Sequence, residues 1–430
     1  MKNRRHFFYL FLCIGWISYC LNGISPAQAQ NSAFSNENRV YSNDIKTVLC
    51  YNRKKEQSLP LYALRSNETL VFGFDDLRGG HRNLTYTVEH CNADWQASAL
   101  PAIDYLESFS EDIIHKYSYS YNTLQKYTHY ELIFPNEKVK PKISGNYILK
   151  VYEDGNKNKP LVSQRIYVLD PRFSVAAQVV PSSDVSSRNT QQKVNFTIAH
   201  PTPIQNPTQE IRAIVMQNAN PLTAISNRQP AFVRPGMLTY DAPGSNEFWG
   251  SNEYRKFDIR SFRYKAAHVQ NLFSDTLFHA VLFPDVSNTA AKYTHEIDDN
   301  GNFFIRNQDG RQQDTDSDYA WVSFSLQAAP PVNGEQVYVM GRFNQYQPDP
   351  AWAMRYDPAK KRYLLDAKLK QGVYDYQYIR FDANKKADNT TYEGTFFETE
   401  NSYQVFVYYR RPGSRWEELA GFAELEKKQR

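Results

Sequence analysis

The chain has 430 residues and a formal net charge of +4, from 50 basic and 46 acidic side chains. Lys2, Arg4 and Arg5 are its only charged residues before position 30, so removing that segment lowers the charge to +1. A nearly neutral chain lacks the basic surface that nucleic-acid binding requires, and we expect no nucleic-acid partner. Aromatic residues make up 15% of the sequence. They suit the half-buried surface of a sheet, and no long stretch has helical periodicity, so an all-β fold is predicted.

The N-terminus has the features of a secretory signal. Basic residues precede the apolar run FFYLFLCIGWISYCL, and Ala27-Gln-Ala29 supplies the small side chains that a signal peptidase recognises. The sequence therefore predicts a signal peptide over residues 1–29 and an exported mature chain. The apolar run is too short for a retained membrane span, so no direct membrane insertion is expected. Tyr19 is too bulky for the position before a lipidated Cys20.

Residues 30–170 contain strand patterns separated by turn formers. The expected strands cover residues 45–51, 69–75, 84–91, 127–134, 145–153 and 163–170. The turn-rich segment 153–160 lies between the last two, so these two strands should form a hairpin. This pattern is typical of an immunoglobulin-like β-sandwich, which we expect to be the first of three consecutive sandwich domains.

Two further sandwiches are expected after Pro171, which stops the preceding strand. The middle domain is expected over residues 171–312, with strands at 173–180, 193–199, 211–218, 257–264, 276–283 and 302–307. An early-set-like C-terminal domain is expected over residues 313–430, with strands at 321–326, 336–344, 362–369, 374–381 and 403–410.

A long loop is expected between residues 218 and 256 of the middle domain. It is rich in Pro, Asn and Gly, and it carries Phe248, Trp249 and Tyr254. Loops of this length are often functional. These three aromatic residues are therefore the candidate partner contact.

The segment YTVEHCNADW concentrates several groups that could serve in chemistry. A catalytic cysteine needs a nearby base, but His90 and Cys91 are adjacent on a strand and point to opposite faces. Zinc would need further clustered ligands, and the sequence has no CxxC pair and no HExxH motif. Alternatively, Asn92 to Asp94 form an Asx-type turn and Trp95 covers the end of the sandwich. We favour this structural interpretation, and we expect no catalytic residue, no metal site and no cofactor.

Two acidic groups also have structural explanations. Asp75 and Asp76 end a strand and precede Leu-Arg-Gly-Gly, which favours a turn or loop cap over acid–base chemistry. The spacing Asp314-x-Asp316-x-Asp318 resembles the start of a calcium loop, yet the required glycine and the distal glutamate are missing. A solvated acidic linker is the favoured interpretation of this stretch.

Cys50 and Cys91 are the cysteines that would remain after signal removal. An oxidising compartment permits a disulfide between them. A closed loop of roughly 40 residues would stabilise the fold by about 4 kcal/mol in the chain-entropy model. Pairing also requires Cα atoms within about 7 Å of each other, which the sequence does not give. The disulfide therefore stays an open question at this point.

Four short blocks in the first region carry a family resemblance. They are FDDL at Phe74–Leu77, HCNADW at His90–Trp95, NTLQKYTHY at Asn122–Tyr130 and SGNY at Ser144–Tyr147. Their types and their order resemble the type IX secretion system plug proteins of Bacteroidetes. As structural family-motif residues, the resemblance marks Asp75, Asp76, His90, Cys91, Asp94, Trp95, Tyr130, Gly145, Asn146 and Tyr147.

The resemblance implies a non-enzymatic periplasmic protein associated with the inner face of the outer membrane. Its partner would be the large outer-membrane β-barrel translocon of the pathway. The protein would close the periplasmic opening of that barrel when no cargo is in transit. The abundance of tyrosine agrees with this role, because Tyr and Trp are favoured at protein interfaces.

A different function is suggested by the segment VYVMGRFNQY. It is similar to the early-set sandwich of glycogen- and starch-binding modules, in which a G-x-F-N-x-W motif supplies a sugar-stacking tryptophan. Tyr346 occupies that position here, and Trp352 follows six residues later. Loss of the indole weakens the analogy, so a shared fold is favoured. A periplasmic or surface glycan-binding protein is the alternative function.

Overall fold

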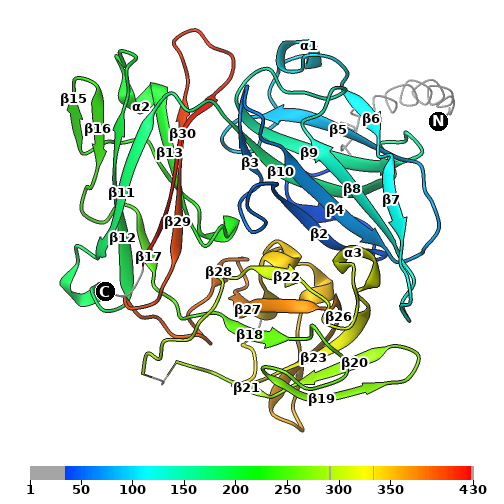
Figure 1. Ribbon diagram of the computed structural model, residues 1–430. Helices are drawn as coiled ribbons and strands as arrows, with labels where there is room; N and C mark the ends of the chain where they lie inside the picture. Colours follow the sequence, from blue (N-terminus) through cyan, green and yellow to red (C-terminus); the bar gives the residue numbers. More distant parts are fainter. Residues whose placement is uncertain (1–33, 290–291, 333, 428–430) are drawn as a thin grey trace, which may run out of the picture. The chain divides into compact units, whose positions relative to one another are not determined.

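The computed structural model describes residues 34–289, 292–332 and 334–427, which belong to one compact unit. Antiparallel strands dominate this part of the chain, as Figure 1 shows, and the all-β expectation is confirmed. Its α-helices are α1 (Ala102–Tyr105), α2 (Pro207–Glu210) and α3 (Gln313–Asp316). None of the described helices is both long and apolar enough to cross a bilayer. The expected signal peptide lies outside the described residues.

The first hydrophobic core lies between two sheets. One sheet contains, in spatial order, β1 (Arg39–Val40), β10 (Pro160–Leu169), β9 (Gly145–Glu153), β5 (Leu84–Cys91) and β6 (Glu111–Ile113), with β3 (Leu61–Ala63) also paired to β10. The other contains β2 (Ile45–Asn52), β4 (Leu70–Asp76), β8 (Thr128–Phe134) and β7 (Lys116–Tyr119). Tyr147, Leu149 and Val151 of β9 point into the core, because side chains alternate along a strand. β9 and β10 form the expected hairpin.

The second core is also enclosed by two sheets. One contains β11 (Ser174–Pro181), β12 (Gln191–Ala199), β16 (Met237–Tyr240) and β15 (Phe232–Arg234), with β17 (Glu247–Trp249) also paired to β12. The other contains β14 (Ile225–Asn227), β13 (Ile211–Gln217), β29 (Ser402–Tyr409) and β30 (Glu418–Glu426). Short 3-10 turns cover Val185–Ser187 and Pro221–Thr223. The segment 218–256, expected as one long loop, therefore contributes β14 to β17 to these sheets.

The third core, which is rich in tyrosine, also lies between two sheets. One sheet contains β18 (Arg255–Asp258), β27 (Gly372–Phe381) and β22 (Phe303–Ile305), with β24 (Gln336–Met340) and β28 (Ala387–Asp388) also on β27. The other contains β19 (Val269–Ser274), β20 (Phe278–Leu282), β23 (Tyr319–Gln327), β26 (Arg362–Lys370) and β25 (Arg355–Asp357), with β21 (Asp285–Val286) on β23. The 3-10 turns here are Arg342–Asn344 and Pro350–Trp352.

Buried tyrosines in this third core keep their hydroxyl groups paired. Tyr376 and Tyr378 of β27 both donate to the Asp285 carboxylate, at 2.8 and 2.6 Å. Tyr374 donates to the Lys370 carbonyl at 2.5 Å. A paired hydroxyl removes most of the cost of burying a polar atom, so these residues supply aromatic area without an unsatisfied donor.

The pairing of strands does not follow the boundary expected near residue 312. The last hairpin, β29 and β30, completes the sheet of β13, with Ile211 opposite Tyr409 and Val215 opposite Val405. β18 and β22, which precede residue 312, pair with β27 of the third core. The chain thus leaves the second core, builds the third and returns. Apolar alternation identifies a strand, but it does not say which distant strand is its partner.

The two cysteines of the described chain are free thiols in different sheets. Cys50 lies on β2 and Cys91 on β5. Burial raises the pKa of the Cys91 thiol to about 12, so this thiol is protonated at neutral pH. The disulfide that the sequence left open is therefore not formed.

A thiol titration tests this assignment. A variant lacking residues 1–29, unfolded in denaturant without reductant, should show two reactive thiols because Cys50 and Cys91 are unpaired. In the native protein Cys91 should react slowly, since it is buried and protonated. A reductant-treated sample is the control and should give the same number. Thiols that become reactive only after reduction would contradict the assignment.

Candidate functional site

The carboxylate of Asp75 joins the first and third cores. It is the next-to-last residue of β4, is fully buried, and contacts Nδ1 of His129 on β8 at 2.7 Å. Its second oxygen accepts hydrogen bonds from the third core, at 2.6 Å from Tyr319 of β23 and 2.7 Å from Lys370 of β26. Tyr319 and Lys370 are directly opposite each other in their sheet. Two strands of one core therefore bind two strands of another through one carboxylate.

The charge of Asp75 is stabilised by its partners. Burial alone would raise the pKa of this carboxyl, but Lys370 and His129 together hold it below its ordinary value. Lys370 is itself held over the ring of Tyr127, 4.2 Å from its centroid, and donates to the Asp314 carbonyl at 2.7 Å. The expectation that Asp75 caps a turn is therefore wrong: it forms a buried ion pair between cores.

Asp76 does serve the local turn. Its carboxylate accepts from the Arg78 amide at 3.1 Å and from the Arg82 guanidinium at 3.0 Å. Arg82 also donates to Glu153 at 2.7 and 2.6 Å, and its amide donates to the Tyr130 hydroxyl at 2.8 Å. The hydrogen bonds from Arg82 lower the pKa of Glu153 to about 2. Asp76 and Tyr130 thus fix the loop after β4 onto the first core.

His90, Gly145 and Tyr147 form a packing unit. The His90 ring is 1% exposed and meets the Tyr147 ring edge-on, with centroids 5.1 Å apart. Gly145 has φ of 145°, and a Cβ there would lie 2.5 Å from His90 Nε2. Within the described chain neither ring nitrogen has a hydrogen-bond partner. Burial lowers the pKa of His90 to about 4, so it is a neutral packing residue at neutral pH.

The end of β5 joins the first core to the second. The Asn92 side chain accepts from the amides of Asp94 at 3.0 Å and Gln96 at 2.9 Å, which confirms the expected Asx turn. Asp94 then binds both terminal nitrogens of Arg212 on β13, with Nη1 at 2.5 Å. Trp95, at φ of 63°, lies under the guanidinium of Arg165, 4.5 Å from its ring centroid.

Asn146 of the SGNY block makes a second link to the same sheet. Its side-chain oxygen accepts from the Tyr408 hydroxyl of β29 at 2.8 Å. Its nitrogen donates to the Asn92 carbonyl at 3.0 Å, so the HCNADW and SGNY blocks meet here. The Ala93 amide adds a bond to the Glu417 carboxylate at 3.0 Å. Of the family-motif residues, Asp75, Asp94 and Asn146 therefore lie at contacts between cores.

The three aromatic residues expected at a partner contact do not form one surface. Phe248 is 5% exposed and packs on Tyr403 in the second core. Tyr254 is 5% exposed and its hydroxyl lies 3.0 Å from that of Tyr346. Trp249 is 50% exposed, because it follows Phe248 on β17 and points to the opposite face. Of the three, only Trp249 remains a candidate contact.

The expected sugar-stacking position is not open to a ligand. Tyr346 is 1% exposed, and its hydroxyl is engaged by Tyr254. Trp352 packs edge-on against Phe343, with ring centroids 5.1 Å apart. A sugar needs an accessible aromatic face, so the geometry of this segment gives no support to the glycan-binding alternative.

The acidic stretch in and after α3 is not a calcium loop. Asp316 accepts from the amides of Arg311 at 3.0 Å and Gln312 at 3.1 Å. Asp318 accepts from the amides of Leu124 and Gln125, the latter at 3.0 Å. Asp314 instead lies near His129 and Glu131, and this is the group in the described chain whose ligand atoms could hold a metal ion.

Sequence reasoning missed the partners of the motif residues. Asp75 and Lys370 lie 295 residues apart, and Asp94 and Arg212 lie 118 apart. In the segment RYLLDAKLK, Lys370 falls on the same face as Asp366 and Lys368, which reads as a solvent-facing pattern. The family resemblance was the available signal in the sequence. It marked Asp75 and Asp94, but it did not mark Lys370 and Arg212, which bind them.

Removing the cation of the buried pair tests the link between the first and third cores. Lys370→Met should destabilise the protein by about 3–5 kcal/mol, because it leaves the Asp75 charge buried without its main partner. Lys368→Met on the same strand is the matched control: Lys368 is partly exposed and bonds Gln125 at 2.8 Å, so its loss should cost below about 1 kcal/mol. Urea unfolding measures both. Equal midpoints for the two variants would contradict the assigned role of Lys370.

Comparison with known proteins agrees with this geometry. The family model described as the type 9 secretion system plug protein 1st domain matches residues 45–170, which include all four motif blocks. A crystal structure at 2.30 Å of a hypothetical protein from Parabacteroides merdae ATCC 43184 has 30% sequence identity and a TM-score of 0.88, and the match covers 91% of this chain and 99% of that chain. None of the curated proteins compared with the chain matches it. Residues 45–170 of this chain therefore belong to the family of type 9 secretion system plug protein 1st domains.

Proposed function

We propose that this chain is a non-enzymatic plug that binds the outer-membrane β-barrel translocon of the type IX secretion system and seals its periplasmic opening in the absence of cargo. The observation that carries the proposal is the match of residues 45–170 to the plug protein family. Family membership associates the chain with the type IX secretion machinery and with the cell envelope. A protein that seals the periplasmic opening of an outer-membrane barrel must lie in the periplasm, at the inner face of the outer membrane.

The contacts of the motif residues support a role without catalysis. His90 packs against Tyr147, Cys91 is a buried protonated thiol, and the acids Asp75 and Asp94 bind cations of other cores. Each group that sequence inspection could assign to chemistry is thus engaged in holding the fold. A plug needs such a fixed shape, because a seal depends on surfaces that match over a large area.

Trp249 is our candidate contact with the translocon. It lies at the end of β17, is half exposed, and its backbone carbonyl is held by Gln217 at 3.0 Å. A fixed backbone with an exposed indole is suited to a partner contact, because little conformational entropy is lost when the ring is buried. The low net charge of the mature chain also favours binding through shape and aromatic burial over salt-sensitive attraction.

Replacing this indole tests the contact. Trp249→Ala should reduce capture of the translocon from detergent-solubilised membranes about tenfold or more, while Tm changes little, because the ring is half exposed. Phe273→Ala is the matched control, since Phe273 is also 50% exposed but lies on β19 of the third core. Capture by Trp249→Ala equal to wild type, or a large fall in Tm with binding intact, would remove Trp249 from the interface.

Deleting the gene tests the seal in the cell. An unplugged channel wide enough for folded cargo should admit antibiotics that the outer membrane excludes, so the deletion should increase sensitivity to vancomycin. Export of type IX cargo should continue at least in part, because the plug closes the channel and does not drive transport. Complementation with the intact gene is the control. Unchanged permeability together with loss of growth on a polysaccharide would instead favour the glycan-binding alternative.

A further inference from the structure

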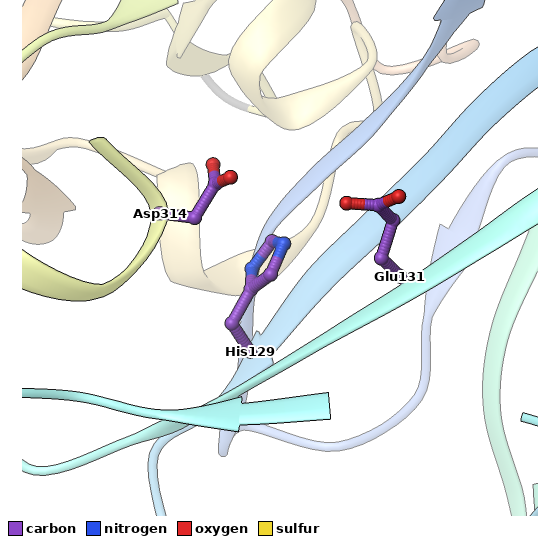
Figure 2. A group of neighbouring side chains, drawn as sticks. All are labelled: His129, Glu131 and Asp314. Atoms are coloured by element: carbon purple, nitrogen blue, oxygen red, sulfur yellow. The ribbon is translucent and has the colours of Figure 1, made fainter. Parts of the chain in front are cut away.

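Three side chains from two distant segments converge on one face of the first core. His129 and Glu131 come from β8, and Asp314 comes from α3. One ligand atom of each lies within 4.8 Å of the others. Figure 2 shows the two carboxylates on either side of the imidazole ring in this view. We expected no metal site from the sequence. The proximity of these side chains could not be seen there, because α3 is far from β8 along the chain.

The His129 ring is already oriented as a metal ligand. Asp75 accepts at 2.7 Å from Nδ1, so the proton belongs on Nδ1 and the Nε2 lone pair is available. A carboxylate behind a histidine is the usual outer partner of a ligating imidazole. Gly73 gives the ring its space: a Cβ there would lie 3.3 Å from His129 Cε1 and 3.5 Å from Nε2.

Asp314 is also held in place, through its backbone. Its carbonyl accepts from the Tyr127 hydroxyl at 2.9 Å and from Lys370 at 2.7 Å. The carboxylates of Asp316 and Asp318 are occupied by backbone amides, whereas an oxygen of Asp314 lies within 4.8 Å of a His129 ring nitrogen. The same two residues, Tyr127 and Lys370, thus position α3 against β8.

We propose that His129, Glu131 and Asp314 form a binding site for a divalent transition metal of the zinc class. One imidazole nitrogen and two carboxylate oxygens are a donor set that zinc accepts, whereas calcium and magnesium prefer oxygen ligands alone. Ligands of a tetrahedral zinc lie roughly 3.3 Å apart, as follows from its bond lengths. The cluster must therefore contract slightly, and the exposed Asp314 side chain can supply that movement.

One cation competes for the site. Lys116 of β7 lies 2.7 Å from Glu131 Oε1, and its side chain is 66% exposed. The exposed Lys116 side chain gains little from this pair, although Glu131 is only 17% exposed, so a zinc ion can displace the lysine. Replacing Lys116 by an uncharged residue should leave the Glu131 carboxylate free to bind the metal. Lys116 and Asp314 therefore give variants with opposite expected effects on metal affinity.

Bound metal would clamp the α3 segment onto β8. This clamp would lie beside the Asp75–Lys370 pair and would strengthen the same junction between the first and third cores. A ligand that binds only the folded state raises Tm by an amount that grows with the logarithm of its concentration relative to its Kd. The site is independent of the proposed plug function, because neither its ligands nor its test involves the translocon.

Calorimetric titration with ZnCl₂ tests the site, using purified protein without a polyhistidine tag and treated with EDTA. Wild type should bind one zinc ion per chain, and zinc should raise its Tm. Asp314→Asn, an exposed change, should leave the metal-free Tm intact and weaken binding about tenfold or more. Lys116→Gln should bind zinc more tightly than wild type.

The control is His115→Ala, since His115 is a nearby histidine whose side chain is 76% exposed. It should bind zinc as wild type does. The proposal is overturned if wild type binds no zinc, or if Asp314→Asn binds it with unchanged affinity. A loss of binding in His115→Ala would likewise overturn it, because it would place the metal on the exposed surface.

Discussion

The buried carboxylate of Asp75 is the contact on which the arrangement of the first and third cores depends. An isolated charge in this position would be far too costly to bury. The cost is offset because Lys370, Tyr319 and His129 surround it within 2.7 Å. Since Lys370 and Tyr319 belong to other strands, the charge is satisfied only when the two cores are together. Asp75 thus couples the folding of the separate sheets to their association, and the bonds from the amides of Leu124 and Gln125 to Asp318 act at the same junction.

The contacts with the second core follow the same principle. Asp94 binds Arg212, and Asn146 binds Tyr408, so motif residues of the first core are satisfied by strands of the second. Polar contacts at such junctions fix how two cores are oriented, because hydrogen bonds and ion pairs require a defined geometry that apolar packing alone does not. Three residues of the short motif blocks, Asp75, Asp94 and Asn146, therefore help to specify how the first core is joined to the other two.

Local features were predictable from the sequence, and distant partners were not. The strands, the β9–β10 hairpin and the Asx turn after Cys91 follow from alternation and turn chemistry. The pairing of β29 with β13 could not be seen, because many strands here have similar apolar faces. Phe248 and Tyr254 were expected at the surface for a related reason: composition shows that a segment is aromatic, but burial depends on strands elsewhere in the chain.

We propose that this protein closes the translocon, and the flux of a tracer through the isolated channel measures that closure. A bulky fluorescent tracer would be allowed to diffuse through the purified barrel into liposomes that contain it. The protein would be added from the side that corresponds to the periplasm. We expect tracer entry to fall as the protein binds and to approach zero when the barrels are saturated. Entry that stays unchanged while the protein is bound to the barrel would contradict it.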